Sequence, residues 1–117
     1  MSGNIKKPWG YFKVLDTQEG YLTKKLYLKP NSKLSLQSHK FRSEHWIVVK
    51  GLATVTIDEN KYNLNINESI YIPMASKHRL ENNNENELII IEVQIGERLE
   101  EDDIIRYADI YGREVSK

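Results

Sequence analysis

The chain consists of short runs in which apolar and polar residues alternate, separated by turn-forming residues. Within residues 21–28, Leu22, Leu26 and Leu28 all occupy even-numbered positions. Residues two apart on a β-strand point to the same face, so this alternation predicts strands with one buried face. Further strands are predicted through Leu34 and Leu36 and over residues 46–49, 53–57, 61–64, 69–72, 78–81 and 88–94, with turns or loops at 30–32, 50–51, 58–60, 65–67 and 82–87. So many short strands are typical of an all-β sandwich or barrel.

The length of 117 residues fits one domain, residues 1–117, and leaves no room for a second catalytic domain. Beyond Gly96 the alternation gives way to a charged stretch, residues 97–103, which could form one short helical turn. We expect the N-terminal segment and this acidic tail to pack across the barrel, with Tyr107 and Tyr111 as apolar anchors of the tail.

Composition excludes several classes of function. The 17 basic and 17 acidic residues give a formal net charge of zero, so nothing favours nucleic acid or an anionic membrane as a partner. Cysteine is absent, which excludes disulfides, thiolate metal sites and a cysteine nucleophile. The N-terminus lacks the apolar core of a secretory signal, and no stretch approaches the roughly 20 apolar residues of a membrane helix. We therefore expect a cytoplasmic protein.

Two of the three histidines lie where they could share a metal. Gln37 and His39 are two apart and would point to the same face of a strand, with Glu44 arriving from the next strand and His78 from across the barrel. Imidazole, carboxylate and amide oxygen suit first-row divalent ions: zinc, manganese, iron or nickel. Each histidine alone would more often be an ordinary polar residue, so the hypothesis depends on the joint pattern.

The pattern Gln37-x-His39-x4-Glu44-x6-Gly51, followed by Pro73-x4-His78-x3-Asn82, resembles the two cupin motifs. Cupins usually have a histidine at the position of Gln37, and glycines near Asn31, Asn67 and Ala75. The longer strings KPWGYFKVL, LSLQSHKFRSEHWIVVKGLATV, YIPMASKHRLEN, IEVQIGE and EDDIIRYADIYGR resemble the type II mannose-6-phosphate isomerase domain over residues 7–113.

In that family the domain usually follows a guanylyltransferase domain that makes GDP-mannose, so this chain resembles the isomerase half standing alone. The resemblance implies a cupin (double-stranded β-helix, or jelly-roll) barrel. It also implies a divalent metal, zinc first, held by Gln37, His39, Glu44 and His78. The implied reaction interconverts mannose 6-phosphate and fructose 6-phosphate.

Such an isomerisation needs a base to move a proton and cations to hold the phosphate. For the base we favour Glu92, which shares one face of its predicted strand with Gln94; burial would raise its pKa, although a solvent-facing Glu92 is equally consistent with the pattern. For the phosphate we favour Arg106, in the tail segment that most resembles the family. Arg42 ranks second, and Lys25 and Arg79 are further candidates. Arg79 directly follows His78 and should point outward unless the strand is bulged.

Other functions remain open at this stage. A metal-dependent dioxygenase would use a similar ligand set and would require iron. A sugar-phosphate-binding module without catalysis would keep the cavity and lack the base. A metal-free epimerase would leave the joint ligand pattern unexplained, and the fold alone does not choose among these. Because small barrels of this type commonly protect their edge strands by pairing, we also expect a homodimer.

Overall fold

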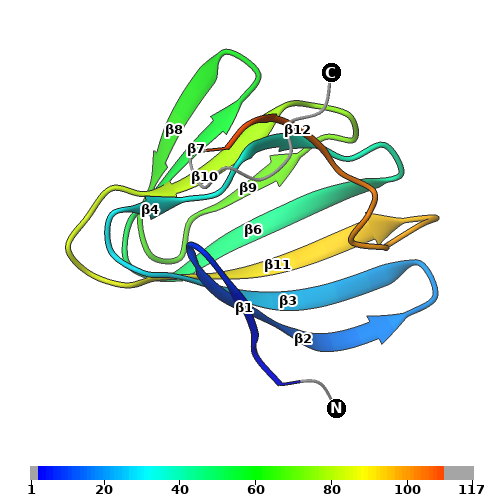
Figure 1. The fold of residues 1–117 in the computed structure, drawn as a ribbon, viewed down its shortest axis with the longest axis horizontal. Coiled ribbons are helices and arrows are strands. Elements are labelled where there is room, and N and C mark those ends of the chain that lie inside the picture. The colour runs from blue at the N-terminus through cyan, green and yellow to red at the C-terminus, as the bar shows by residue number, and fades with distance from the viewer. Residues whose placement is uncertain (1–2, 110–117) are drawn as a thin grey trace.

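The computed structural model describes residues 3–109, and all of its regular elements within that range are β-strands. The first sheet has the order β1-β2-β3-β11-β6-β9, formed by Ile5–Lys7, Gly10–Gln18, Tyr21–Leu28, Leu88–Gly96, Arg42–Lys50 and Ser69–Ile72. The second has the order β12-β5-β10-β7-β8, formed by Ile105–Ala108, Leu36–Ser38, His78–Asn82, Ala53–Ile57 and Asn60–Leu64, with β4 (Ser32–Lys33) also pairing with β10. The two antiparallel sheets enclose one interior, which confirms the all-β prediction (Figure 1).

Two details differ from the sequence prediction. The strand expected through Leu34 and Leu36 is divided into β4 and β5, and Leu34 between them donates its N–H to the carbonyl of Leu80 on β10. Residues 97–103 form no helix. They make one turn at residues 101–102, closed by a hydrogen bond from the Asp103 N–H to the Glu100 carbonyl, and then continue as an extended strap into β12.

The terminal segments take defined places at the edges of the sheets. β1 and β2 extend the first sheet beyond β3, and β12 pairs with β5 at the edge of the second (Figure 1). The expected anchor Tyr107 donates to or accepts from the hydroxyl of Ser38 at 2.9 Å, whereas Tyr111 lies outside the described residues. No helix long and apolar enough to cross a membrane occurs within residues 3–109.

The barrel interior is apolar at one end and polar at the other. The apolar end contains side chains with no solvent exposure: Leu28, Val48, Ala53, Val55, Leu80, Leu88 and Ile90. The polar end contains Lys24, Gln37, His39, Arg42, Glu44, His78, Glu92 and Gln94, all buried. The pairing of β11 with β6 connects the two ends. Ile90 is opposite Val48 in the apolar part, and four residues further along β11, Gln94 is opposite Glu44.

Candidate metal centre

Three ligand-type side chains converge at the polar end of the barrel. His39 lies in the loop after β5, Glu44 is on β6 and His78 begins β10; one ligand atom from each lies within 4.8 Å of the others. Gln37 on β5 is directly opposite His78 in the sheet register and lines the same cavity. Two imidazoles, a carboxylate and an amide are a donor set that fits a first-row divalent ion.

The histidine tautomers are set by main-chain carbonyls. Nδ1 of His39 is 2.8 Å from the carbonyl oxygen of Asp103, and Nδ1 of His78 is 3.1 Å from that of Ser76. A carbonyl only accepts, so each Nδ1 carries a hydrogen and Nε2 is the ring nitrogen left to face the site. The two Nε2 atoms face the Glu44 carboxylate, at 3.3 Å for His39 and 3.9 Å for His78. Both rings therefore turn Nε2 toward the site, and Nε2 is the nitrogen that would bind a metal.

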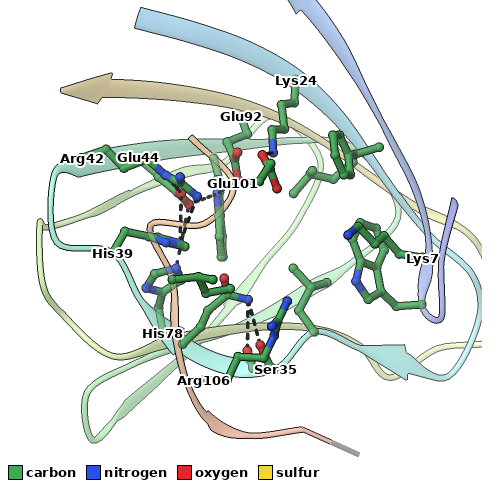
Figure 2. Close-up of a pocket in the computed structure, with 17 residues that line it drawn as sticks. Lys7, Lys24, Ser35, His39, Arg42, Glu44, His78, Glu92, Glu101 and Arg106 are labelled. Carbon is green, nitrogen blue, oxygen red and sulfur yellow. Dashed lines mark hydrogen bonds and ion pairs between the residues drawn. The ribbon is translucent and has the colours of Figure 1, made fainter. Parts of the chain in front are cut away.

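Arg42 lies against the ligand atoms themselves. Its Nε donates to Oε2 of Glu44 at 2.8 Å, and its Nη2 donates to Nε2 of His39 at 3.2 Å. Burial, followed by the positive charge of Arg42 and the neighbouring His78, lowers the pKa of His39 to about 3. His39 is consequently uncharged at neutral pH, the state in which imidazole binds metals. The structure thus places Arg42 at the metal end of the cavity (Figure 2).

The C-terminal strap holds the loop that carries His39. The two carboxylate oxygens of Asp103 accept hydrogen bonds from the N–H groups of Lys40 and Phe41, both at 2.9 Å. Burial alone would raise the pKa of Asp103, but these two donors outweigh it, and the pKa is below its ordinary value. Asp103 therefore fixes His39 through its carbonyl and the following two residues through its side chain.

Glu92 lies inside the barrel, on the same face of β11 as Gln94. Its Oε1 accepts from Nε1 of Trp46 at 2.8 Å and its Oε2 accepts from Nε2 of Gln94 at 2.7 Å. Burial, and next the negative charge of Glu44, raise the pKa of Glu92 above its usual value. A carboxyl group with a raised pKa, in the same cavity as the ligands, is suited to accept and return a proton.

The other cationic candidates fall on both sides of the barrel wall. Arg106 lines the cavity, and its buried Nε has no hydrogen-bond partner among the described residues. Lys25 lies on the outer face of the first sheet, with its Nζ 5.6 Å from the ring centroid of Tyr11. Arg79 donates to the carbonyls of Leu34 and Ala108. The structure does not bring Lys25 or Arg79 to the cavity, because each is one residue out of phase with an inward-facing neighbour.

Sequence reasoning missed Lys24, Lys7 and Glu101, which line the cavity opposite the ligands. Lys24 was accessible from the pattern, because it shares the parity of Leu22 and Leu26 on the buried face of β3. Nothing in the local sequence identifies Lys7 or Glu101. They reach the cavity from the first strand and the strap, and only the tertiary fold brings them there.

Comparison with known proteins identifies the relatives of this chain. Residues 1–109 match the model of the mannose-6-phosphate isomerase C-terminal family. The chain is 51% identical over 109 residues to "Alginate biosynthesis protein AlgA" of Pseudomonas syringae and 48% identical over 109 residues to "Mannose-1-phosphate guanylyltransferase" of Escherichia coli. Each alignment covers 93% of this chain and 23% of the relative, so the chain spans less than a quarter of their length.

The fold has solved counterparts as well. The structure titled "Schizosaccharomyces pombe Cnp3 Cupin Domain" superimposes with a TM-score of 0.71 and 10% identity, over 74% of this chain and 64% of that one. At such low identity the likeness concerns the fold alone, and it confirms the predicted cupin barrel. Taken with the match over residues 1–109, this shows that the chain belongs to the mannose-6-phosphate isomerase C-terminal family of cupins.

Proposed function

We propose that this chain is a metal-dependent aldose–ketose isomerase that interconverts mannose 6-phosphate and fructose 6-phosphate. The observation that carries the proposal is one cavity that contains two histidines and a glutamate placed to share a metal, a buried carboxyl group with a raised pKa, and the Arg106 Nε, which has no hydrogen-bond partner among the described residues. Family membership favours this substrate, and the names of the relatives favour a place in GDP-mannose and polysaccharide synthesis.

The metal would be held by Gln37, His39, Glu44 and His78. Zinc suits this donor set best, with manganese, nickel or iron as alternatives. When bound, a divalent ion stabilises negative charge on the oxygens of a sugar as an enediolate develops. Asp103 and Ser76 would keep both imidazoles oriented, through the carbonyl contacts at Nδ1.

Glu92 would move the proton. In an aldose–ketose isomerisation, the base removes a proton from the carbon next to the carbonyl group and returns it to the former carbonyl carbon, so one carboxylate suffices for both carbon transfers. The hydroxyl proton passes from its oxygen to the former carbonyl oxygen in the same conversion. Trp46 and Gln94 hold the two oxygens of Glu92 and fix its direction. Arg106 would donate to a substrate oxygen, since its buried Nε has no partner among residues 3–109.

The test is turnover of mannose 6-phosphate by the purified protein, with a chelator and then with zinc, manganese, nickel or iron restored. We expect turnover to disappear with the chelator and to return with metal. A folded, metal-loaded protein that binds the sugar phosphate and converts none of it would identify a binding module instead. Oxygen consumption that depends on iron would favour the dioxygenase.

The homodimer and the cytoplasmic location expected from the sequence are part of the proposal. Apolar side chains exposed on the outer face of the first sheet, Ile47, Val49 and Ile95, are compatible with self-association. Light scattering during size-exclusion chromatography would measure the oligomeric state. A monomer at micromolar concentration would contradict the homodimer and leave the isomerase proposal unaffected.

A further inference from the structure

Lys24 is a buried ammonium group on the inward face of β3. It is 4% exposed, and its Nζ lies 4.1 Å from the ring centroid of Phe12 on β2. The Nζ of Lys7, on β1, lies 5.7 Å from the same centroid. Two cations therefore lie near one aromatic ring at the wall of the cavity. A buried lysine usually has an anionic partner.

The partner of Lys24 comes from the strap. Oε2 of Glu101 is 2.5 Å from Nζ of Lys24, and the side chain of Glu101 is 57% exposed while that of Lys24 is 5% exposed. In Figure 2 the two side chains point toward each other, and Arg106 enters from the other side of the view. Burial would raise the pKa of Glu101, but the positive charges of Lys24, Arg42 and Lys7 lower it overall. The position of the Glu101 carboxylate beside Lys24 thus favours a negatively charged group.

The cavity has more positive than negative groups. Its lining includes the cations Lys7, Lys24, Arg42 and Arg106 against the carboxyl groups of Glu44, Glu92 and Glu101. Glu44 is already paired with Arg42, and Glu92 is held by neutral donors. Glu101 is the one carboxylate of the cavity that can turn into solvent without leaving the barrel, because more than half of its side chain is exposed.

We propose that Lys24, assisted by Lys7, forms the subsite for the phosphate monoester of the substrate, and that Glu101 is a displaceable counter-ion which holds this subsite until the phosphate arrives. The inference rests on the proposed function only in naming a sugar phosphate as the ligand. A phosphate carries more negative charge than a carboxylate at neutral pH and offers three acceptor oxygens, so it can replace Glu101 at Lys24. The buried ammonium then pairs with the stronger anion, and Glu101 turns into water.

The experiment measures binding by calorimetry, using the full zinc-loaded chain with inorganic phosphate, mannose 6-phosphate and mannose as separate ligands. Lys24→Met keeps the length of the side chain over Phe12 and removes its charge; its matched control is Lys25→Met on the outer face. Glu101→Gln removes the competing charge; its matched control is Glu100→Gln, which loses only the exposed pair with Arg98.

Lys24→Met should weaken binding of both phosphate ligands by about tenfold or more and leave mannose unchanged, since a charge-assisted hydrogen bond is lost. Glu101→Gln should tighten both phosphate ligands about twofold to fivefold, the range expected for releasing a partly exposed ion pair. Neither control variant should differ from wild type. If Lys24→Met does not fold, the comparison of Glu101→Gln with Glu100→Gln decides alone.

Two results would overturn the inference. One is equal phosphate affinity in Lys24→Met and Lys25→Met, with the loss appearing only in Arg106→Gln. The other is weaker phosphate binding in Glu101→Gln. Because binding is measured without turnover, the isomerase proposal is judged separately. Phosphate binding that depends on Lys24 in a protein without isomerase activity would support the subsite and contradict the isomerase proposal. Isomerase activity that does not depend on Lys24 would support the isomerase proposal and contradict the subsite.

Discussion

The two ends of the barrel are built by the same strands with opposite chemistry. On β11, Leu88 and Ile90 fill the apolar end, and Glu92 and Gln94 fill the polar end on the same face. β6 and β3 change in the same way and at matching levels, so that Lys24 is opposite Glu92 where Leu26 is opposite Ile90. Because every second side chain of a strand points to the same face, all these side chains lie inside the barrel. Only their chemical type distinguishes the hydrophobic core from the candidate metal site.

The difference shows which end stabilises the fold. Burial of apolar side chains contributes about 1.5–3 kcal/mol for each large residue, whereas a buried charge costs free energy unless it is paired and hydrogen-bonded. At the polar end the charges are compensated by specific partners, such as Arg42 for Glu44 and Glu101 for Lys24. We therefore expect substitutions at the two ends to affect different properties.

The largest effect should come from Glu92→Gln, which keeps the shape of the polar end and removes the base. We expect kcat to fall about 10²–10⁴-fold, the usual contribution of general acid–base catalysis, with metal affinity nearly unchanged. Steady-state kinetics and calorimetry with zinc would measure the two properties. Glu87→Gln, just before β11 and paired with Lys50 at the surface, is the control. Equal rates for both variants would remove Glu92 from the mechanism.

At the apolar end, Leu28→Ala should lower the free energy of unfolding and leave the site intact. Leu28 has no solvent exposure and is opposite Leu88, so truncation opens a cavity and should cost about 2–5 kcal/mol. Denaturant unfolding measures the loss. Zinc affinity in the folded variant should stay within about threefold of wild type, because sites far apart without shared partners behave additively. A parallel loss of zinc affinity would mean that the two ends are coupled.

Asp103→Asn tests whether the strap belongs to the polar end. Asparagine has one acceptor oxygen where aspartate has two, so the N–H of either Lys40 or Phe41 loses its partner. Zinc affinity should fall about 10–100-fold, as for other groups that orient metal ligands. Asp102→Asn changes the neighbouring, 82% exposed carboxylate and should have no effect on zinc binding. Equal zinc affinities in the two variants would leave Asp103 with a structural role only.

The sequence predicts the inward positions better than their partners. Strand parity puts Glu92 on one face with Gln94 without choosing between the interior and solvent, and the spacing from Gln37 to Glu44 brings the ligands together. Lys24 shares the parity of the buried Leu22 and Leu26, and sequence reasoning overlooked it. The sequence does not predict that Asp103 holds a loop more than 60 residues earlier in the chain, because that contact depends on the path of the strap. Residues 97–103 likewise form one hydrogen-bonded turn and no helix, and Asp103 at the end of this segment is bound to Lys40 and Phe41 far away in the sequence.

The loop before His78 contains a residue in an unfavourable backbone conformation. Ala75 has φ of 69°, and its N–H donates to the carbonyl of His39 at 2.9 Å. The cupin pattern that the sequence resembles leads us to expect glycine near this position, and glycine adopts positive φ without the cost to a Cβ atom. Ala75→Gly should raise the free energy of unfolding by about 0.5–1 kcal/mol, after the entropy that glycine gains in the unfolded chain. Thermal unfolding measures it, and a lower melting temperature would contradict the reasoning.

The smallest effect should be the pH dependence of the polar end. The Lys24 ammonium holds the pKa of Glu101 in the folded chain below its ordinary value, so the ionised form favours folding. Its contribution is therefore complete well above pH 4.5 and is lost as the pH falls through the lower folded value. Because the side chain of Glu101 is 57% exposed, the free energy of unfolding of wild type should exceed that of Glu101→Gln by no more than about 0.5 kcal/mol at pH 7.

The two ends should differ in this respect too. The loss of unfolding free energy in Leu28→Ala should be the same at pH 4 and pH 7, since no titrating group is lost. The loss in Glu101→Gln should be smaller at the lower pH. Unfolding of both variants and wild type in urea at the two pH values, without metal, would measure this. A deficit of Glu101→Gln that grows on acidification would mean that protonated Glu101 stabilises the fold, and that its pairing with Lys24 is not what holds the strap.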